Sequence, residues 1–183
     1  QLKVGHWQNN CFMGPVIHQK TAQQLLQQRQ QLIDNGGEAL LPMQPQTDLG
    51  QCYLSPGIID MSAAQQLDDE EIFGPLLQIF YANDLNQALT MANNTRFGLA
   101  AGFIGDNPQQ QAYFQQHINA GVISINKPTA GASSELPFGG IGASGNFHPS
   151  AYYAADYCAW PQAQMHGERS DKQLSDVPAG FIS

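Results

Sequence analysis

The chain has 183 residues, of which 42% are hydrophobic, so it can form one compact domain with a core but not two large ones. Only 12% of the residues are charged and the formal net charge is −8, which argues against nucleic acid and anionic membranes as partners. The sequence contains no apolar run long enough to cross a bilayer, and its composition favours a soluble protein that binds small molecules.

The amino-terminal part of the chain predicts one helix and one strand. Over residues 17–33 the apolar side chains recur at helical spacing, with glutamine and arginine on the opposite face. Asn35-Gly36-Gly37 ends this helix, because glycine readily adopts the left-handed conformation found after a last helical turn. Residues 53–61 have strand character that is interrupted at Pro56-Gly57. The first residues include no initiator Met, and we expect the chain to be part of a longer one.

From residue 76 onward strands and helices alternate. Asn83 or Asp84 can cap one helix, and Asn107-Pro108 can open another, since proline at a first turn lacks an amide proton that has no partner there. Short connections between such elements are typical of parallel βαβ units. The sequence therefore predicts an α/β fold with a parallel sheet flanked by helices, its strands lying at residues 76–82, 99–104 and 121–126.

The last third of the chain breaks this alternation. Residues 127–148 are rich in Gly, Ala and Ser and predict a long loop, of a kind that is usually functional or disordered. A short helix is expected at residues 150–156 and a short strand near residues 158–164. We therefore divide the chain into a catalytic-domain part (1–148), an oligomerisation helix and strand (149–165) and a polar tail (166–183).

Glu71-Ile72-Phe73-Gly74-Pro75 is the strongest candidate for a binding segment. The residue before a proline is disfavoured in helical conformation, so we expect this stretch to be extended. Side chains two apart then share a face, which places Glu71 and Phe73 together and Ile72 on the other side. A carboxylate can accept hydrogen bonds from a ribose diol, and a neighbouring ring offers a flat wall to a nicotinamide. The alternative is that Glu71 is a surface acid and Phe73 a core residue.

Four ordered motifs resemble hallmarks of the aldehyde dehydrogenase superfamily. They cover roughly residues 12–160 and are Phe12-Met13-Gly14-Pro15, Glu70-Glu71-Ile72-Phe73-Gly74-Pro75, Asn93-Asn94-Thr95-Arg96-Phe97-Gly98-Leu99-Ala100-Ala101, and Pro137-Phe138-Gly139-Gly140 with Ser144-Gly145. Residues 131–134 and 146–158 further resemble the subgroup that oxidises succinylglutamate semialdehyde in arginine breakdown, because Asn146-Phe147-His148 stands where many members have Gly-Arg-Glu.

This resemblance implies roles for individual residues. Glu71 is expected to hold the nicotinamide-side ribose of NAD, with NADP not excluded, while Phe73 and Leu99 lie near the nicotinamide ring. Phe138 is expected to line the aldehyde pocket, and Ser133 and Ser134 are expected to shape its mouth.

The resemblance also implies that the catalytic residues lie outside this chain. The family's reaction starts with attack of a cysteine thiolate on the aldehyde and ends with release of the acid by a glutamate-activated water. The nucleophile stands in a Gly-Gln-x-Cys context upstream of the Met-Gly-Pro landmark, and Cys11, Cys52 and Cys158 all lack that context. We expect the chain alone to be inactive and not to bind NAD tightly.

Other features of the sequence favour ordinary structural explanations. Gly140-Ile141-Gly142-Ala143-Ser144-Gly145 satisfies GxGxxG, but a loop precedes it and no helix pattern follows, so close packing beside the active site is favoured over a dinucleotide fingerprint. Asp68 and Asp69 are interpreted as a solvated face. The scattered histidines predict no metal site, and the unpaired cysteines favour a reducing, cytoplasmic compartment.

A second function class remains open beside that of an enzyme part. The chain could act mainly as an assembly module, since in the resembled family the carboxyl-terminal strand pairs with a neighbouring subunit. A strand edge near residues 158–164 could serve as such a template. We accordingly expect a homo-oligomer formed through this strand.

Overall fold

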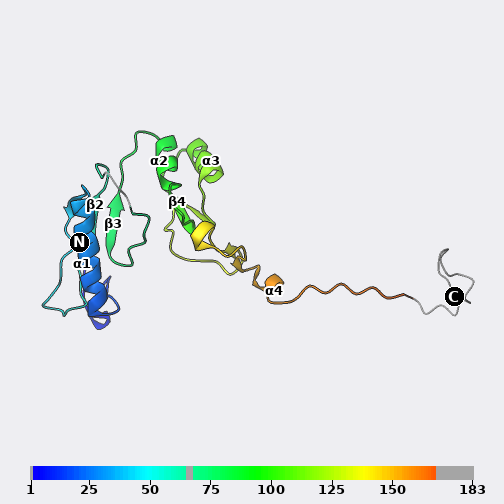
Figure 1. The fold of residues 1–183 in the computed structure, drawn as a ribbon, viewed down its shortest axis with the longest axis horizontal. Coiled ribbons are helices and arrows are strands. Elements are labelled where there is room, and N and C mark those ends of the chain that lie inside the picture. Colours follow the sequence, from blue (N-terminus) through cyan, green and yellow to red (C-terminus); the bar gives the residue numbers. More distant parts are fainter. Residues whose placement is uncertain (1, 65–67, 168–183) are drawn as a thin grey trace, which may run out of the picture.

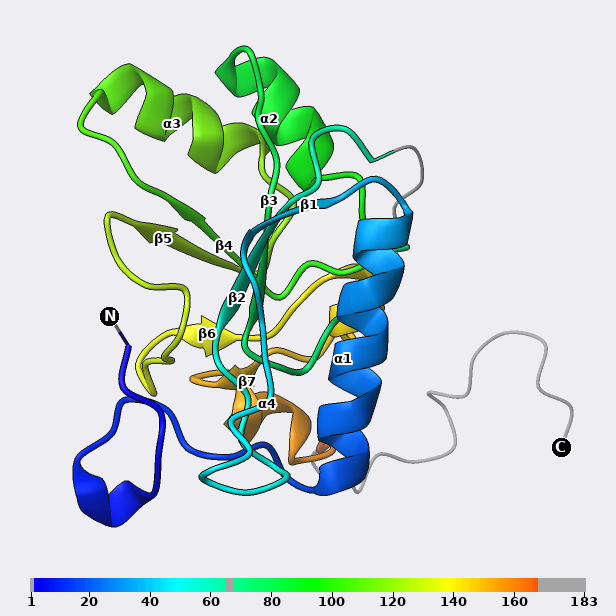
Figure 2. The same cartoon turned by 90° about the vertical axis from the view of Figure 1, so that its left-hand side faces the viewer.

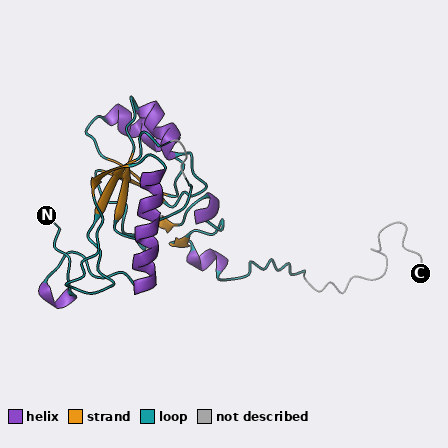
Figure 3. Cartoon of the chain, turned by 60° about the vertical axis from the view of Figure 1, so that its left-hand side comes forward, coloured by secondary structure: helices purple, strands orange, loops and turns teal. Residues whose placement is uncertain are grey.

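The computed structural model describes residues 2–64 and 68–167 and has the expected α/β class (Figures 1 and 3). The described strands form three small sheets rather than one continuous sheet. A short 3-10 helix, η1 (Trp7–Asn9), precedes the first long helix. Within the described residues, no helix combines the length and the apolar character needed to cross a bilayer.

The first sheet joins three strands from the amino-terminal half of the chain. Its order is β1-β2-β3, formed by β1 (Glu38–Leu41), β2 (Gly57–Asp60) and β3 (Leu76–Ile79). β2 pairs antiparallel with β1 and parallel with β3, with Gly57 opposite Leu76 and Asp60 opposite Ile79. A Cβ atom on Gly57 would lie 2.6 Å from the Met43 Cβ, so only glycine fits where the chain enters β2.

Helix α1 (Gln19–Asp34) packs along this sheet (Figure 2). The ring of His18 accepts a hydrogen bond from the Thr21 N–H over 3.1 Å and caps the helix start. The helix ends at Asn35, and Gly36 follows with φ of 101°, as expected for a glycine after a last turn. The helical prediction for residues 17–33 is thus confirmed to within two residues.

The main core lies between α1 and the first sheet. Its buried members are at most 3% exposed and are Ala22, Leu25, Met43 and Leu54. Four partly buried side chains pack against them, those of Val16, Leu26, Ile72 and Leu76. The Arg29 guanidinium donates to the Met43 carbonyl over 2.6 Å, which ties the helix to the loop between β1 and β2. Ile72 therefore reaches the core from the candidate binding segment.

The second half of the chain forms a βαβ unit. The unit consists of β4 (Ala100–Phe103), α3 (Pro108–His117) and β5 (Val122–Ile125), and the helix α2 (Leu85–Ala92) precedes it. β4 and β5 pair in parallel, and α2 lies beside α3 at one end of the molecule (Figures 1 and 2). Asp84 caps α2 and Asn107 caps α3 through side-chain oxygens, so both predicted helix starts are confirmed. The Phe103 and Phe114 rings, 5.4 Å apart, pack α3 onto β4.

The predicted strand pairing is only partly correct. β4 and β5 pair as expected, but β3 hydrogen-bonds to β2 instead of to β4. Residues 57–60, after the Pro56-Gly57 interruption, form a complete strand on one edge of β3, and no described strand pairs with the other edge.

The predicted loop at residues 127–148 contains short regular elements. β6 (Pro137–Phe138) pairs antiparallel with β7 (Ser150–Ala151), and η2 (Gly142–Ser144) forms a single 3-10 turn between them. In place of the helix expected at residues 150–156, the structure has the shorter helix α4 (Ala154–Tyr157).

The predicted strand near residues 158–164 does not form. This segment leads away from the rest of the molecule (Figure 1), where no other described strand can supply the hydrogen bonds that a strand needs. Trp160 in it is 91% exposed. Most of the expected polar tail, residues 168–183, lies outside the described residues.

Candidate functional site

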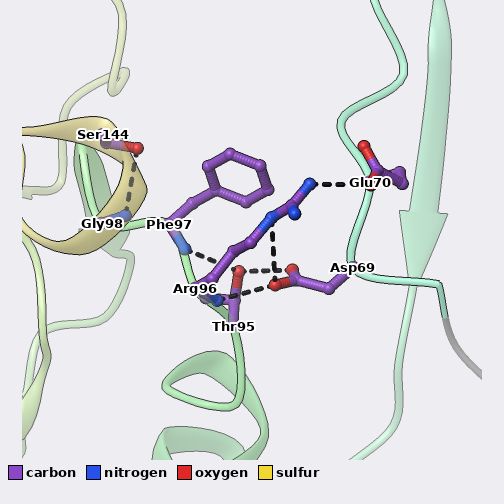
Figure 4. A network of polar contacts seen from close by, with 7 residues as sticks. All are labelled: Asp69, Glu70, Thr95, Arg96, Phe97, Gly98 and Ser144. Carbon is purple, nitrogen blue, oxygen red and sulfur yellow. Dashed lines mark hydrogen bonds and ion pairs between the residues drawn. The ribbon is translucent and has the colours of Figure 1, made fainter.

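Three of the four motif segments meet at one arginine. Figure 4 shows Arg96 between the acidic segment that leads to Glu71 and the loop that contains Ser144. We call Asp69, Glu70, Thr95 and Arg96 the Arg96 junction, because hydrogen bonds among these residues join segments that lie 26 and 27 positions apart in sequence. The fourth motif, at residues 12–15, lies apart from the junction, where Val4 forms a bridge with Met13.

Asp69 provides the main polar contact of the junction. One carboxylate oxygen accepts the Thr95 hydroxyl over 2.6 Å, and the other accepts the Arg96 backbone N–H over 2.7 Å. These bonds favour the ionised carboxylate, so the pKa of Asp69 lies below its ordinary value, mainly through the Arg96 N–H and next through the Thr95 hydroxyl. The interpretation of Asp69 as part of a solvated face agrees with its exposed side chain, but it does not include the two donors that the turn at residues 95–96 supplies.

The Arg96 side chain adds a second connection to the acidic segment. Its Nη2 lies 2.7 Å from the Glu70 Oε1 and its Nε lies 3.9 Å from the Asp69 Oδ2. The guanidinium also stands over the Phe97 ring, 4.8 Å from the centroid. These groups are about half exposed, so water screens the ion pairs and their main effect is to orient Arg96.

The glycine-rich loop packs against the other side of the same turn. The Ile141 N–H donates to the Gly98 carbonyl over 3.0 Å, and the Ala143 N–H donates to the Arg96 carbonyl over 2.8 Å. Gly142 has φ of 56°, and a Cβ there would collide with the Arg96 carbonyl oxygen. The structure agrees with close packing rather than with a dinucleotide fingerprint for the GxGxxG match.

Glu71 and Phe73 lie on the solvent side of their segment. Phe73 is 78% exposed and Glu71 is exposed too, whereas Ile72 between them packs against the core cluster. Gly74 lies over the Leu25 side chain, where a Cβ would approach to 2.5 Å. This alternation is the expected one, and the alternative in which Phe73 is a core residue is wrong.

Leu99 directly follows the turn at the junction. It is 43% exposed, and its carbonyl accepts the Val122 N–H over 2.9 Å at the start of the β4–β5 pair. Leu99 is thus fixed by the second sheet, while Glu71 and Phe73 are fixed by the first sheet and its helix. The Arg96 junction connects these two parts.

The expected substrate residues lie on the loop beyond the glycine-rich turn. Phe138 is half-buried on β6, and its carbonyl accepts the Ser150 hydroxyl over 3.0 Å. Ser133 and Ser134 are exposed, and the Ser133 hydroxyl accepts the Glu135 N–H over 3.2 Å. No hydrogen bond within the described residues ties either serine to the Arg96 junction.

Sequence reasoning missed Asp69, Arg96 and Ser144 as parts of the site. Arg96 and Ser144 belong to two of the four motifs and Asp69 to the acidic run before a third, but their contacts span long sequence separations that no local pattern reveals. An acidic run followed by an arginine inside a hallmark motif is the only sequence signal for the pairing. The polar contacts that assemble the site involve no cysteine, and the described residues contain no cluster of three metal-binding side chains.

The comparisons with known proteins agree with this geometry. The sequence pattern that describes the aldehyde dehydrogenase family matches residues 1–160. N-succinylglutamate 5-semialdehyde dehydrogenase of Legionella pneumophila (strain Paris) is 51% identical over 166 residues, which cover 90% of this chain. The match spans only 33% of that relative.

Solved structures share the fold. Aldehyde dehydrogenase 21 from Physcomitrella patens, in complex with the reaction product succinate, matches with a TM-score of 0.76 at 25% identity over 85% of this chain and 32% of its own. 1-Pyrroline-5-carboxylate dehydrogenase from Thermus, with bound NAD, matches with a TM-score of 0.72 at 25% identity over 82% of this chain and 29% of its own.

Proposed function

The chain belongs to the aldehyde dehydrogenase family, and we propose that it forms the carboxyl-terminal part of an enzyme that oxidises N-succinylglutamate 5-semialdehyde to N-succinylglutamate with NAD. The observation that carries the proposal is the Arg96 junction, which gathers three family motifs and leaves Glu71 and Phe73 facing outward beside it. The substrate assignment rests on the 51% identity to the Legionella relative. Arginine breakdown in the cytoplasm is part of the same proposal.

The residues present suit a nicotinamide nucleotide. Glu71 makes no hydrogen bond to another described residue, so both carboxylate oxygens can accept hydrogen bonds from a ribose diol. Phe73 and Leu99 provide apolar surface that can exclude water from one side of a bound nicotinamide. When bound, the cofactor supplies the hydride acceptor, and the part of these three residues is to hold and orient it.

The aldehyde site is assigned to the loop beyond the junction. Phe138 is half-buried on β6 and can contribute an apolar wall, while the exposed Ser133 and Ser134 can donate hydroxyl protons to a carboxylate of the substrate. In this proposal the nucleophilic cysteine and the general-base glutamate come from polypeptide that this chain does not contain. The chain spans about a third of the relative it matches, which leaves room for both.

A reconstituted enzyme tests this function. We define it as this chain joined to the part of the Legionella relative that lies outside the matched third of that protein. We expect NADH formation with N-succinylglutamate 5-semialdehyde at a higher kcat/KM than with simple aliphatic aldehydes, and none from the 183-residue chain alone. Equal or faster turnover of unrelated aliphatic aldehydes would defeat the substrate assignment, and activity of the isolated chain would defeat the division of the active site.

Glu71→Gln probes the cofactor assignment within that enzyme. Losing a charged acceptor should raise the KM for NAD by about tenfold or more, because hydrogen bonds to charged groups contribute about 1.5–3 kcal/mol. Asp68→Asn, a change at an exposed acid of the same run, is the matched control and should leave this KM unchanged. An unchanged KM for NAD in Glu71→Gln would remove Glu71 from the cofactor site.

Assembly through the carboxyl-terminal segment is the second part of the proposal. Residues 158–167 run away from the molecule without regular structure, and the exposed Trp160 lies within them (Figure 1). The described residues offer this segment no strand partner, and pairing with the same segment of a second copy would give a homo-oligomer. Light scattering should give more than one copy per particle for the reconstituted enzyme and a lower mass after deletion from residue 158; a monomer before deletion would contradict this.

A further inference from the structure

We propose that Asp69 is a positioning residue of the cofactor site, whose carboxylate fixes the Glu71–Phe73 segment against the turn that carries Leu99. The proposal rests on the proposed function, since it concerns how the NAD-facing groups are held. It assigns Asp69 no contact with cofactor or substrate.

The geometry shows how one side chain can join the two halves of the site. Asp69 precedes Glu71 by two residues, and its two oxygens accept from Thr95 and from Arg96, just before Leu99. The Thr95 oxygen in turn accepts the Phe97 N–H over 3.2 Å, so the contact continues into the turn (Figure 4). A carboxylate held by both oxygens is fixed in direction as well as in distance.

The two ends of the Glu71–Phe73 segment are held differently. In the middle of the segment Ile72 packs on the core, and on the carboxyl side Gly74 lies over Leu25 and the Pro75 carbonyl accepts the Gly57 N–H over 2.8 Å. On its amino side the described contacts are the polar bonds of Asp69 and Glu70 to the turn. Glu71, next to the polar end, therefore depends on these bonds more than Phe73 does.

Asp69 rather than Glu70 is the better candidate for this role. Among the described residues the Glu70 side chain bonds only to the Arg96 guanidinium, and it is 68% exposed, so water competes for that contact. Asp69 is 41% exposed and bonds a backbone N–H, which has a fixed position in the turn. Substituting Arg96 itself would remove the Glu70 contact but would keep its backbone N–H for Asp69.

The test is a double-mutant cycle in the reconstituted enzyme. Asp69→Asn should raise the KM and the dissociation constant for NAD about tenfold, which corresponds to about 1.4 kcal/mol of binding free energy. The KM for the aldehyde should stay within about twofold of the wild-type value. In a Glu71→Gln background the same substitution should add little, because Asp69 acts through Glu71. Thr95→Val should give part of the effect, and Asp68→Asn, the matched control, none.

Several outcomes would overturn the proposal. Additive effects of Asp69→Asn and Glu71→Gln would mean that Asp69 does not act through Glu71. Equal changes in the KM values for NAD and for the aldehyde would mean that the substitution only loosens the fold. An equally large effect of Asp68→Asn would mean that the loss of any negative charge in this run weakens NAD binding.

A separate measurement on the isolated chain distinguishes a failure of this inference from a failure of the proposed function. Amide hydrogen exchange at Arg96 should be about tenfold faster in Asp69→Ala than in wild type or Asp68→Ala, because the substitution removes the acceptor of that N–H. If the reconstituted enzyme fails on every aldehyde while exchange behaves as expected, the proposed function fails and the positioning contact stands. An unchanged exchange rate at the Arg96 N–H would rule out the positioning role of Asp69, whatever activity the reconstituted enzyme shows.

Discussion

The backbone N–H of Gly98 donates to the hydroxyl of Ser144 over 3.2 Å and so joins positions that lie 46 residues apart. Gly98 is buried, and a Cβ there would lie 2.5 Å from the Ile141 side chain. The glycine-rich loop therefore closes directly over the turn between the Arg96 junction and Leu99. The Ser144 hydroxyl and the absence of a side chain at Gly98 thus add to the backbone hydrogen bonds that join these two family motifs.

Ser144→Ala should destabilise the chain. Removing the hydroxyl leaves the buried Gly98 N–H without its acceptor, at a cost of about 1–3 kcal/mol in the free energy of unfolding. Urea denaturation of the chain measures this difference. Ser134→Ala, at an exposed serine of the preceding loop, is the matched control and should change the free energy by less than about 0.5 kcal/mol. Equal stability of the two variants would show that the loop is not held by this bond.

Gly121→Ala should disrupt the packing of the Pro-Phe-Gly-Gly loop on β5. A Cβ at Gly121 would overlap the Gly139 carbonyl oxygen, and backbone cannot move aside as a flexible side chain can. We expect a loss of about 3 kcal/mol, as for severe overpacking. Gly14→Ala is the control, because no atom lies within 4 Å of its Cβ position. Thermal unfolding measures the stability of both variants. A Gly121→Ala variant as stable as Gly14→Ala would contradict the close contact between Gly121 and Gly139.

Leu25→Ala should weaken the support beneath the candidate binding segment. Leu25 is 2% exposed and lies under Gly74, so truncation leaves a cavity between α1 and residues 71–75. Such substitutions cost about 2–5 kcal/mol. Leu40→Ala on β1, where the side chain is 50% exposed, should cost far less. Similar urea midpoints for the two variants would be incompatible with a core at Leu25.

The Asp69 contact predicts a dependence of stability on pH. The folded-state pKa of Asp69 lies below its unfolded value, because the Arg96 N–H and the Thr95 hydroxyl favour the carboxylate, with the Arg96 guanidinium also nearby. The stabilisation is therefore present above the ordinary value near 3.8 and is lost as the pH falls through the lower folded pKa.

A comparison of wild type with Asp69→Asn measures that dependence. The difference in urea midpoint should be constant from neutral pH down to mildly acidic pH and should shrink below it. The pKa of Asp60 is also lowered, through the Ser62 hydroxyl and backbone, but Asp60 is present in both proteins and its effect cancels. Asp68→Asn should show no such pH-dependent difference, and a difference that grows on acidification would have the wrong sign.

Local patterns in the sequence were enough to predict the helix starts and the family. Asp84 and Asn107 predicted the starts of α2 and α3 because a side-chain cap acts within three residues, and the apolar spacing of α1 acts within a turn. The alternation at Glu71, Ile72 and Phe73 was predictable for the same reason, since an extended chain turns each side chain to the opposite face.

Which segments contact one another is seen only in the tertiary structure. The pairing of β3 with β2, the two donors to Asp69 and the closure of Ser144 over Gly98 all join residues far apart in sequence. The strand expected at residues 158–164 did not form, because a strand needs a partner and the described chain offers none there. Hydrogen bonds between distant segments depend on the position of both partners in space, and a local sequence pattern specifies only one of them.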